Sequence, residues 1–235
     1  ETRTEHLNEA LLTLNKYIEV GQQEVKKYGE VFTPLSLVKE MVATLPEEVW
    51  SNPNLKWLDP ANGMGNFPLI VIYKLMKGLK TWEPDTDKRY KHIIENMIYV
   101  SELQPRNAFM YLSLVDPKDD LDVNLYCGSF LDEGFDNHMK QVWDIEKFDI
   151  VMGNPPYNDN TGKKGKTAAT LWPRFLQKSI ENILKIDAYL LMITPISWMS
   201  PGKQLIRNRI MPIYFQANEF LSLNIDCAKY FKVGS

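Results

Sequence analysis

The chain contains few of the residues that metal sites and disulfide frameworks need. Among its 235 residues there are two cysteines, Cys127 and Cys227, and three histidines. The cysteines lie far apart, and the sequence has no CxxC pair and no Cys/His cluster. This pattern argues against a zinc site and against a secreted fold held by disulfides. We therefore expect no metal in the functional site.

Long hydrophobic runs are also missing. The longest, residues 67–73 and 188–193, are much shorter than the roughly 20 apolar residues that span a bilayer. No charged start followed by an apolar stretch and a small-residue cleavage site opens the chain. These absences predict a cytoplasmic protein with no membrane partner.

The chain has no excess of positive charge. It carries 27 Lys and Arg against 30 Asp and Glu, a net charge of −3, so composition alone does not indicate a nucleic-acid binder. Positive charge does gather at Lys163, Lys164 and Lys166, with Arg174 following. This segment could contact phosphates or could be a solvated loop, and the sequence favours neither interpretation.

Apolar periodicity predicts a single α/β domain, since 44% hydrophobic residues in a chain of this length can form one sizeable core. Strands are expected over residues 55–58, 96–101, 123–126, 148–152 and 188–193, with 218–225 as a candidate sixth; helices over 67–79, 104–115 and 171–184; and a charged, exposed insertion over 82–92. This alternation implies a doubly wound, mostly parallel sheet with helices on both faces.

Helical spacing over residues 1–24 predicts an N-terminal amphipathic helix. It either packs on this domain or links it to an upstream segment, and the sequence does not decide between them. A second helix follows the segment from Tyr28 to Thr33. Thr33 is expected to be its N-cap and Pro34 its first helical residue.

The most distinctive stretch is the apolar run from Phe148, which ends in Asn154-Pro155-Pro156-Tyr157. The prolines lack a backbone N–H and fix φ, so the loop is rigid. Asn154 and the backbone beside Pro155 offer carbonyl acceptors, and Tyr157 offers a flat face for stacking. Such a loop fits a planar group that carries an –NH2, although the motif alone could be a simple strand-ending turn.

A second special turn, Asp59 to Asn66, follows the first expected strand. Gly63 and Gly65 allow a ligand to approach the backbone closely, while Asp59 supplies an acceptor, so a nucleoside-like cofactor is the natural occupant. The turn lacks the third glycine of the dinucleotide fingerprint and is a weak signal alone. Glu102, after the second strand, stands where a carboxylate for ribose hydroxyls is expected.

In this order the segments resemble the adenine-N6 DNA methyltransferases of restriction–modification systems. The resemblance is carried by residues 29–34 (GEVFTP), 59–67 (DPANGMGNF), Glu102 and residues 154–157 (NPPY). It implies a Rossmann-like methyltransferase domain over residues 25–235 that uses S-adenosylmethionine, and it implies that a target-recognition domain follows, so we expect a truncated chain. Double-stranded DNA is the expected partner, with a nuclease or a specificity domain or subunit as a further one.

The resemblance also implies roles for individual residues. The residues implied to bind the cofactor are Tyr28, Thr33, Pro34, Asp59, Pro60, Ala61, Gly63, Gly65, Phe67, Glu102, Ser129 and Phe130. Those implied to act on a flipped adenine are Asn154, Pro155, Pro156 and Tyr157, with Phe231 either contacting the base or packing in the core. The DNA backbone is assigned to Lys163, Lys164 and Lys166.

Two departures from the family pattern leave alternatives open. Asn62 stands where cysteine is common, and Ser129 replaces the acid that usually binds the cofactor's adenine amino group, although Asp132 can substitute for that acid. The same acceptor loop would also serve a methyltransferase acting on an RNA adenine or a protein glutamine. A DNA-binding subunit that keeps the fold without catalysis is the remaining alternative.

Overall fold

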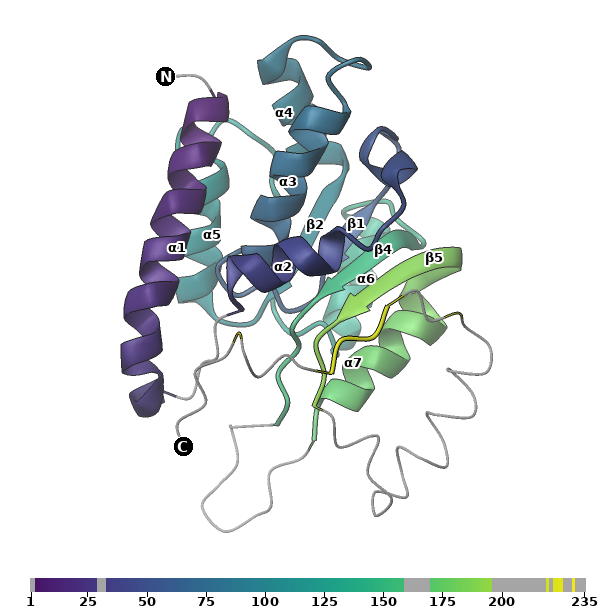
Figure 1. Cartoon of the computed structure of the whole chain (residues 1–235). Coiled ribbons are helices and arrows are strands. Elements are labelled where there is room, and N and C mark those ends of the chain that lie inside the picture. The colour runs from purple at the N-terminus through teal and green to yellow at the C-terminus, as the bar shows by residue number, and fades with distance from the viewer. Residues whose placement is uncertain are drawn as a thin grey trace.

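The computed structural model describes residues 3–28, 33–158, 170–195, 219, 222–225 and 230. Its centre is a five-stranded sheet with the order β3-β2-β1-β4-β5, in which every pair of neighbouring strands is parallel (Figure 1). The strands are β1 (Trp57–Asp59), β2 (Ile98–Glu102), β3 (Asn124–Cys127), β4 (Phe148–Gly153) and β5 (Leu184–Met192). The predicted doubly wound, Rossmann-like fold is confirmed.

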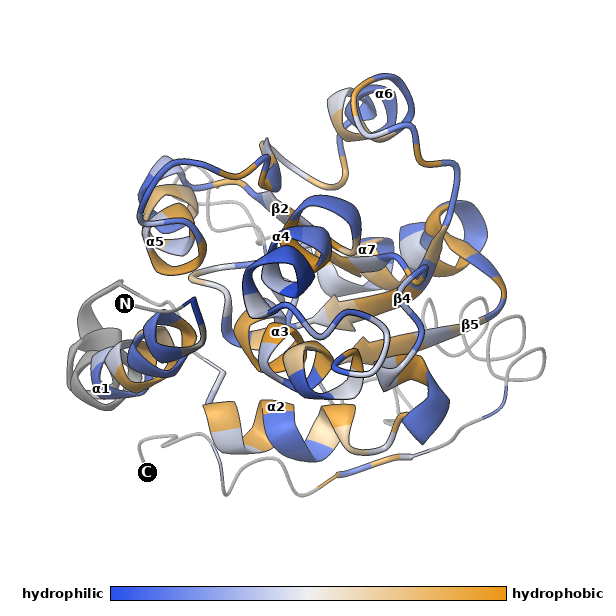
Figure 2. Cartoon of the chain, turned by 90° about the horizontal axis from the view of Figure 1, so that it is seen from above, coloured by the Kyte–Doolittle hydropathy of each residue, from blue (hydrophilic) through white to orange (hydrophobic). Residues whose placement is uncertain are grey.

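Helices cover both faces of the sheet. They are α1 (Arg3–Tyr28), α2 (Leu35–Val42), α3 (Asn66–Gly78), α4 (Thr86–Asn96), α5 (Pro105–Val115), α6 (Glu133–Gln141) and α7 (Trp172–Lys178), with a 3₁₀ turn (Glu47–Trp50) and a π turn (Ser179–Ile183) that continues α7. One apolar core joins α1 to α5 with the sheet, and a second joins α6 and α7 with the opposite face (Figure 2). Neighbouring residues on β1 divide between them, because Trp57 enters the first core and Leu58 the second.

The order in which the chain adds strands to the sheet reverses between β1 and β4. The chain leaves β1 toward β2 and β3 on one side, and it continues from β4 to β5 on the other. In such sheets the turns at the carboxyl ends of the two strands on either side of the reversal line a ligand crevice. The expected meeting of the glycine turn after β1 with the loop after β4 is therefore confirmed by the strand order.

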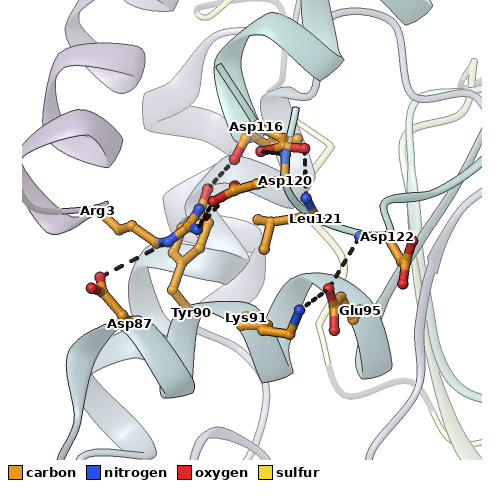
Figure 3. Close-up of polar contacts among 10 residues, drawn as sticks. Arg3, Asp87, Tyr90, Lys91, Glu95, Asp116, Asp120, Leu121 and Asp122 are labelled. Atoms are coloured by element: carbon orange, nitrogen blue, oxygen red, sulfur yellow. Dashed lines mark hydrogen bonds and ion pairs between the residues drawn. The ribbon is translucent and has the colours of Figure 1, made fainter. Parts of the chain in front are cut away.

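The N-terminal helix packs on the first core. Leu7, Ala10 and Leu14 are buried within it. At the start of α1, Arg3 makes a double hydrogen bond to the Asp120 carboxylate, at 2.9 and 3.0 Å, and lies over the ring of Tyr90 (Figure 3). Helix α1 therefore packs with the other helices of the first apolar core.

Residues 82–92 differ most from expectation, because they contain the start of α4 rather than an exposed insertion. Asp85 caps α4 by accepting hydrogen bonds from the backbone N–H groups of Asp87 and Lys88, both at 3.0 Å. Tyr90 is buried and its hydroxyl donates to the Val115 carbonyl at 2.7 Å. The many charged residues obscured the buried face of α4 in the sequence, since most of them lie on its solvent face, although Arg89 is buried.

Other boundaries also need correction. Pro34, and not Thr33, is the N-cap of α2, which begins at Leu35. The expected helix over 171–184 is split into α7 and a π turn, and β5 begins four residues earlier than expected, at Leu184. Helix α6 was not anticipated. Residues 219 and 222–225, the described part of the candidate sixth strand, are not in a strand.

Within the described ranges, no helix has both the length and the apolar character needed to cross a membrane.

Candidate functional site

Two glycines with left-handed backbone conformations shape the glycine turn, and they have different roles. Gly63 has φ +57° and Gly65 has φ +96°, which L side chains rarely adopt. A Cβ on Gly65 would lie 2.5 Å from Cδ2 of Tyr111, so packing against α5 requires glycine there. Among the residues that the structure describes, other than its chain neighbours, none has an atom within 4 Å of a Cβ on Gly63. Gly63 therefore borders open space, as a residue in close contact with a ligand would.

Asp59 ends β1 and is 1% exposed. Its Oδ1 accepts a hydrogen bond from the Ala61 N–H at 3.0 Å, which starts the turn. Burial raises the pKa of Asp59 to about 8, the Ala61 hydrogen bond opposes the rise, and the nearby Glu102 carboxylate adds to it. The Asp59 carboxyl group is thus mostly protonated at neutral pH, and a cation bound beside it and Glu102 would favour its ionised form.

Glu102 ends β2 and holds the glycine turn against it. One carboxylate oxygen accepts from the Gly63 N–H at 2.7 Å, and the other accepts from the Gln104 N–H at 2.8 Å. The Asn62 N–H also donates to the Ser101 carbonyl at 3.0 Å. Since a carboxylate oxygen can accept more than one hydrogen bond, Glu102 can shape the turn and still bind a hydroxyl.

Asn154 follows β4 directly and has an unpaired acceptor. Its amide nitrogen donates to the Thr33 hydroxyl at 3.1 Å. Its side-chain oxygen is buried and, among the described residues, has no hydrogen-bond partner. A buried polar atom without a partner is costly, so this oxygen is available to a further donor such as a bound ligand.

Thr33 joins the acceptor loop to the glycine turn. Besides accepting from Asn154, it receives on its backbone carbonyl a hydrogen bond from the side-chain amide of Asn66, the first residue of α3. Thr33 and Asn66 are both 6% exposed. Sequence reasoning missed Asn66, which carried no signal beyond its place after Gly65.

The two turns also touch through Gly153, the last residue of β4. A Cβ at this position would lie 2.8 Å from Oδ1 of Asp59. Sequence reasoning missed Gly153 as well, because its need for glycine depends on the β1–β4 pairing. The candidate cofactor turn and the candidate acceptor loop therefore form one continuous site.

The rest of the acceptor loop is partly covered. Pro155 is buried, Pro156 is exposed and Tyr157 is half-buried. Tyr157 packs with Trp172 and Leu176 of α7, and its carbonyl accepts from the Leu171 N–H at 2.9 Å. These contacts hold the Tyr157 end of the loop against α7.

The other expected site residues differ in exposure. Phe67 and Phe130 are core residues, 2% and 1% exposed, and Phe130 stacks on Phe175 with ring centroids 5.3 Å apart. Pro60 is buried, whereas Pro34, Ala61 and Ser129 are half-buried. The Ser129 hydroxyl accepts from the Leu131 N–H at 3.2 Å. The Tyr28 side chain and the whole of Lys163, Lys164, Lys166 and Phe231 lie outside the described residues.

Comparisons with known proteins show the family of this chain and which solved structures share its fold. The family model described as Eco57I restriction-modification methylase matches residues 80–213, more than half of the chain. An uncharacterized adenine-specific methylase from Mycoplasma pneumoniae is 28% identical over 246 residues, covering 76% of this chain and 58% of that protein. The chain thus spans only part of the length of this curated relative.

Two solved structures share the fold. The M protein of the type I restriction enzyme EcoKI superposes with a TM-score of 0.52 at 21% identity, covering 77% of this chain and 37% of that one. A Listeria monocytogenes protein assigned to the class I S-adenosylmethionine-dependent methyltransferases has a TM-score of 0.52 at 13% identity, covering 84% of this chain and 58% of that one. At these identities the likeness shows the fold alone.

Proposed function

Since the chain belongs to the Eco57I restriction-modification methylase family, we propose that it transfers a methyl group from S-adenosylmethionine to N6 of an adenine in DNA. The observation that carries the proposal is the buried side-chain oxygen of Asn154, which has no hydrogen-bond partner in the part of the chain that the structure describes. The adenine-specific name of the Mycoplasma pneumoniae relative supports adenine as the base.

The proposed role of Asn154 is to activate the exocyclic nitrogen of adenine as a nucleophile. That nitrogen is a poor nucleophile because its lone pair is delocalised into the ring. A hydrogen bond from the –NH2 to the Asn154 oxygen, and another to the backbone carbonyl at Pro155, favour a tetrahedral nitrogen and stabilise the positive charge that develops during attack. These bonds strengthen as the reaction proceeds, so they lower the barrier.

The residues around the glycine turn fit S-adenosylmethionine. When bound, this cofactor supplies a methyl group already activated by its sulfonium. A cation bound beside Glu102 and Asp59 would favour the ionised form of the Asp59 carboxyl group, and Gly63 leaves room for close approach. Neither a metal nor a strong base is required, because aligning the reactants provides much of the rate enhancement.

Tyr157 is proposed to stack on the flipped base. In duplex DNA the adenine nitrogen is engaged in base pairing, so the base must leave the helix before it can reach Asn154. Tyr157 lies three residues from Asn154 and is half-buried against α7, which holds its ring in a fixed place. An aromatic face suits this role because base stacking tolerates any neighbouring sequence.

Lys163, Lys164 and Lys166 are proposed to contact DNA phosphates. Asn158 and Thr170 pair as an antiparallel bridge next to Tyr157, so the segment between them starts and ends beside the acceptor loop. Replacing the three lysines with glutamine should weaken DNA binding for every sequence alike. Log affinity falls as log salt concentration rises, and each lost phosphate contact should make this fall less steep by about 0.9. An unchanged slope would remove these lysines from the interface.

The cofactor assignment is tested by calorimetry. S-adenosylmethionine should bind the chain, and Asp59→Ala and Glu102→Ala should each weaken binding about tenfold or more, as expected for the loss of a hydrogen bond to a charged group. Lys91→Ala, which removes an exposed ion pair with Glu95, is the control and should bind normally. No detectable heat and no thermal shift at millimolar cofactor would rule the assignment out.

The role of Asn154 is tested in the full-length protein by single-turnover methyl transfer. Asn154→Ala should lose about 100-fold or more in rate while DNA affinity stays near wild type, since the interaction strengthens only in the transition state. Asn158→Ala, at an exposed asparagine four residues on, is the matched control and should keep its rate. RNA and glutamine-containing peptides should accept no methyl group. Transfer to either in place of DNA would assign a different substrate.

A further inference from the structure

We propose that Thr33 is a positioning residue that fixes the side-chain amide of Asn154 with its oxygen toward the substrate. The inference rests on the proposed function. It gives Thr33 a part in the orientation of the catalytic amide that is separate from helix capping and from cofactor binding.

The Thr33 hydroxyl is placed to hold one end of the amide. Its Oγ1 accepts from Nδ2 of Asn154 at 3.1 Å. Within the described ranges, this is the hydrogen bond of the amide nitrogen, while Oδ1 of the same amide is buried and unpaired. The contact therefore separates the two ends of the amide, with the nitrogen toward Thr33 and the oxygen toward the site.

Hydrogen bonding, and not steric fit, determines which way this amide is oriented. The oxygen and the NH2 group of an asparagine are nearly equal in size, so a half-turn about the last side-chain torsion fits the same space. After such a turn, the NH2 of Asn154 would face the –NH2 of the substrate, donor against donor. Only hydrogen bonding distinguishes the productive orientation, and Thr33 supplies that bond on the protein side.

Thr33 is itself held in place. Its carbonyl accepts from the Asn66 side chain at the start of α3, and it is buried. Because Pro34 and not Thr33 is the N-cap of α2, the Thr33 hydroxyl is not used in capping and remains available to Asn154. Through Thr33, the side-chain amide of Asn154 is thus connected to Asn66 at the end of the glycine turn.

The experiment compares Thr33→Val, which keeps the shape and removes the hydroxyl, with Thr33→Ser, which keeps the hydroxyl. Single-turnover transfer is measured in the full-length protein at saturating S-adenosylmethionine and DNA, so that a loss of cofactor affinity does not enter the rate. Thr33→Val should be slower by about tenfold, the worth of one hydrogen bond, and Thr33→Ser should restore most of the rate. If Thr33→Val does not fold, Thr33→Ala replaces it.

A double-mutant cycle shows whether Thr33 acts through Asn154. In Asn154→Asp the two oxygens are equivalent and there is no amide to orient, so Thr33→Val should slow this variant by less than about twofold. An undiminished tenfold effect in the Asn154→Asp background would overturn the proposal. So would a Thr33→Val enzyme with the wild-type rate at saturation.

These outcomes are distinct from a failure of the proposed function. If Asn154→Ala were as active as wild type, the assignment of Asn154 itself would fall. If Asn154→Ala is inactive while Thr33→Val is fully active at saturating cofactor, only the positioning role of Thr33 is lost.

Discussion

Asp59 and Gly153 meet across the β1–β4 pair, where a Cβ on Gly153 would lie 2.8 Å from Oδ1 of Asp59. Glycine at the end of β4 leaves the space that the buried carboxyl group occupies. Asp59 belongs to the candidate cofactor turn and Gly153 precedes Asn154, so this contact joins the two halves of the site.

The contact predicts that Gly153→Ala destabilises the fold by about 1–3 kcal/mol, since an added methyl group forces a buried carboxyl group to move. Asp59→Ala should relieve the clash, so the double variant should lose less stability than the sum of the two single changes. Urea unfolding of the four proteins measures this coupling. Additive losses would show that the methyl group is accommodated elsewhere.

The raised pKa of Asp59 predicts a stability that depends on pH. The folded pKa of about 8 lies above the unfolded value of 3.8, so between these limits the native state keeps a proton that the unfolded chain has lost. Stability from this group is complete below pH 3.8 and is lost as pH rises through 8, with a slope of up to about 1.4 kcal/mol per pH unit. Asp59→Asn, which does not titrate, should flatten the dependence in unfolding experiments from pH 5 to pH 8. An equally steep curve for this variant would assign the effect to another group.

The two glycines of the turn should respond differently to alanine. Gly65→Ala should be strongly destabilising, because its methyl group would clash with Tyr111 at 2.5 Å and its φ of +96° is unsuited to alanine. The methyl group of Gly63→Ala would lie within 4 Å of no described atom beyond its chain neighbours, so this change should cost only about 1–2 kcal/mol for its left-handed backbone. Its main effect should be a loss of cofactor affinity, measured by calorimetry on the folded variant. Normal affinity in Gly63→Ala would mean that the cofactor does not approach this backbone.

Tyr157 is predicted to matter through its ring and not its hydroxyl. Tyr157→Phe should keep substantial activity, whereas Tyr157→Ala should impair base capture and turnover. Fluorescence of 2-aminopurine at the target position reports flipping, and single-turnover transfer reports the rate. Because Tyr157 also packs on Trp172 and Leu176, the thermal stability of each variant is the necessary control. A Phe variant as inactive as the Ala variant would show that the hydroxyl is required.

The packing of α1 predicts a contrast between two leucines of the same helix. Leu14 is 1% exposed and Leu12 is 63% exposed. Leu14→Ala should lower the free energy of unfolding by about 2–5 kcal/mol, and Leu12→Ala should change it by less than about 0.5 kcal/mol. Equal effects in chemical denaturation would mean that α1 does not pack on the core in solution.

The sequence by itself determined the sheet and the candidate turns. Alternating apolar strands and helices indicated the doubly wound fold, and the residues after β1, β2 and β4 were recognised because special turn chemistry is local in sequence. The sequence did not predict α4, because the charged face of this helix obscured the buried Tyr90. It also predicted Thr33 as the N-cap of α2, whereas Pro34 holds that position.

Only the tertiary structure decided how these turns work together. The hydrogen bonds from Asn154 and Asn66 to Thr33 join residues more than thirty positions apart, which no local pattern can encode. The need for glycine at position 153 likewise arises only when β4 pairs with β1 beside the buried Asp59. The sequence specifies residue types and their spacing, whereas contacts between residues far apart in the sequence depend on the packing of the whole sheet.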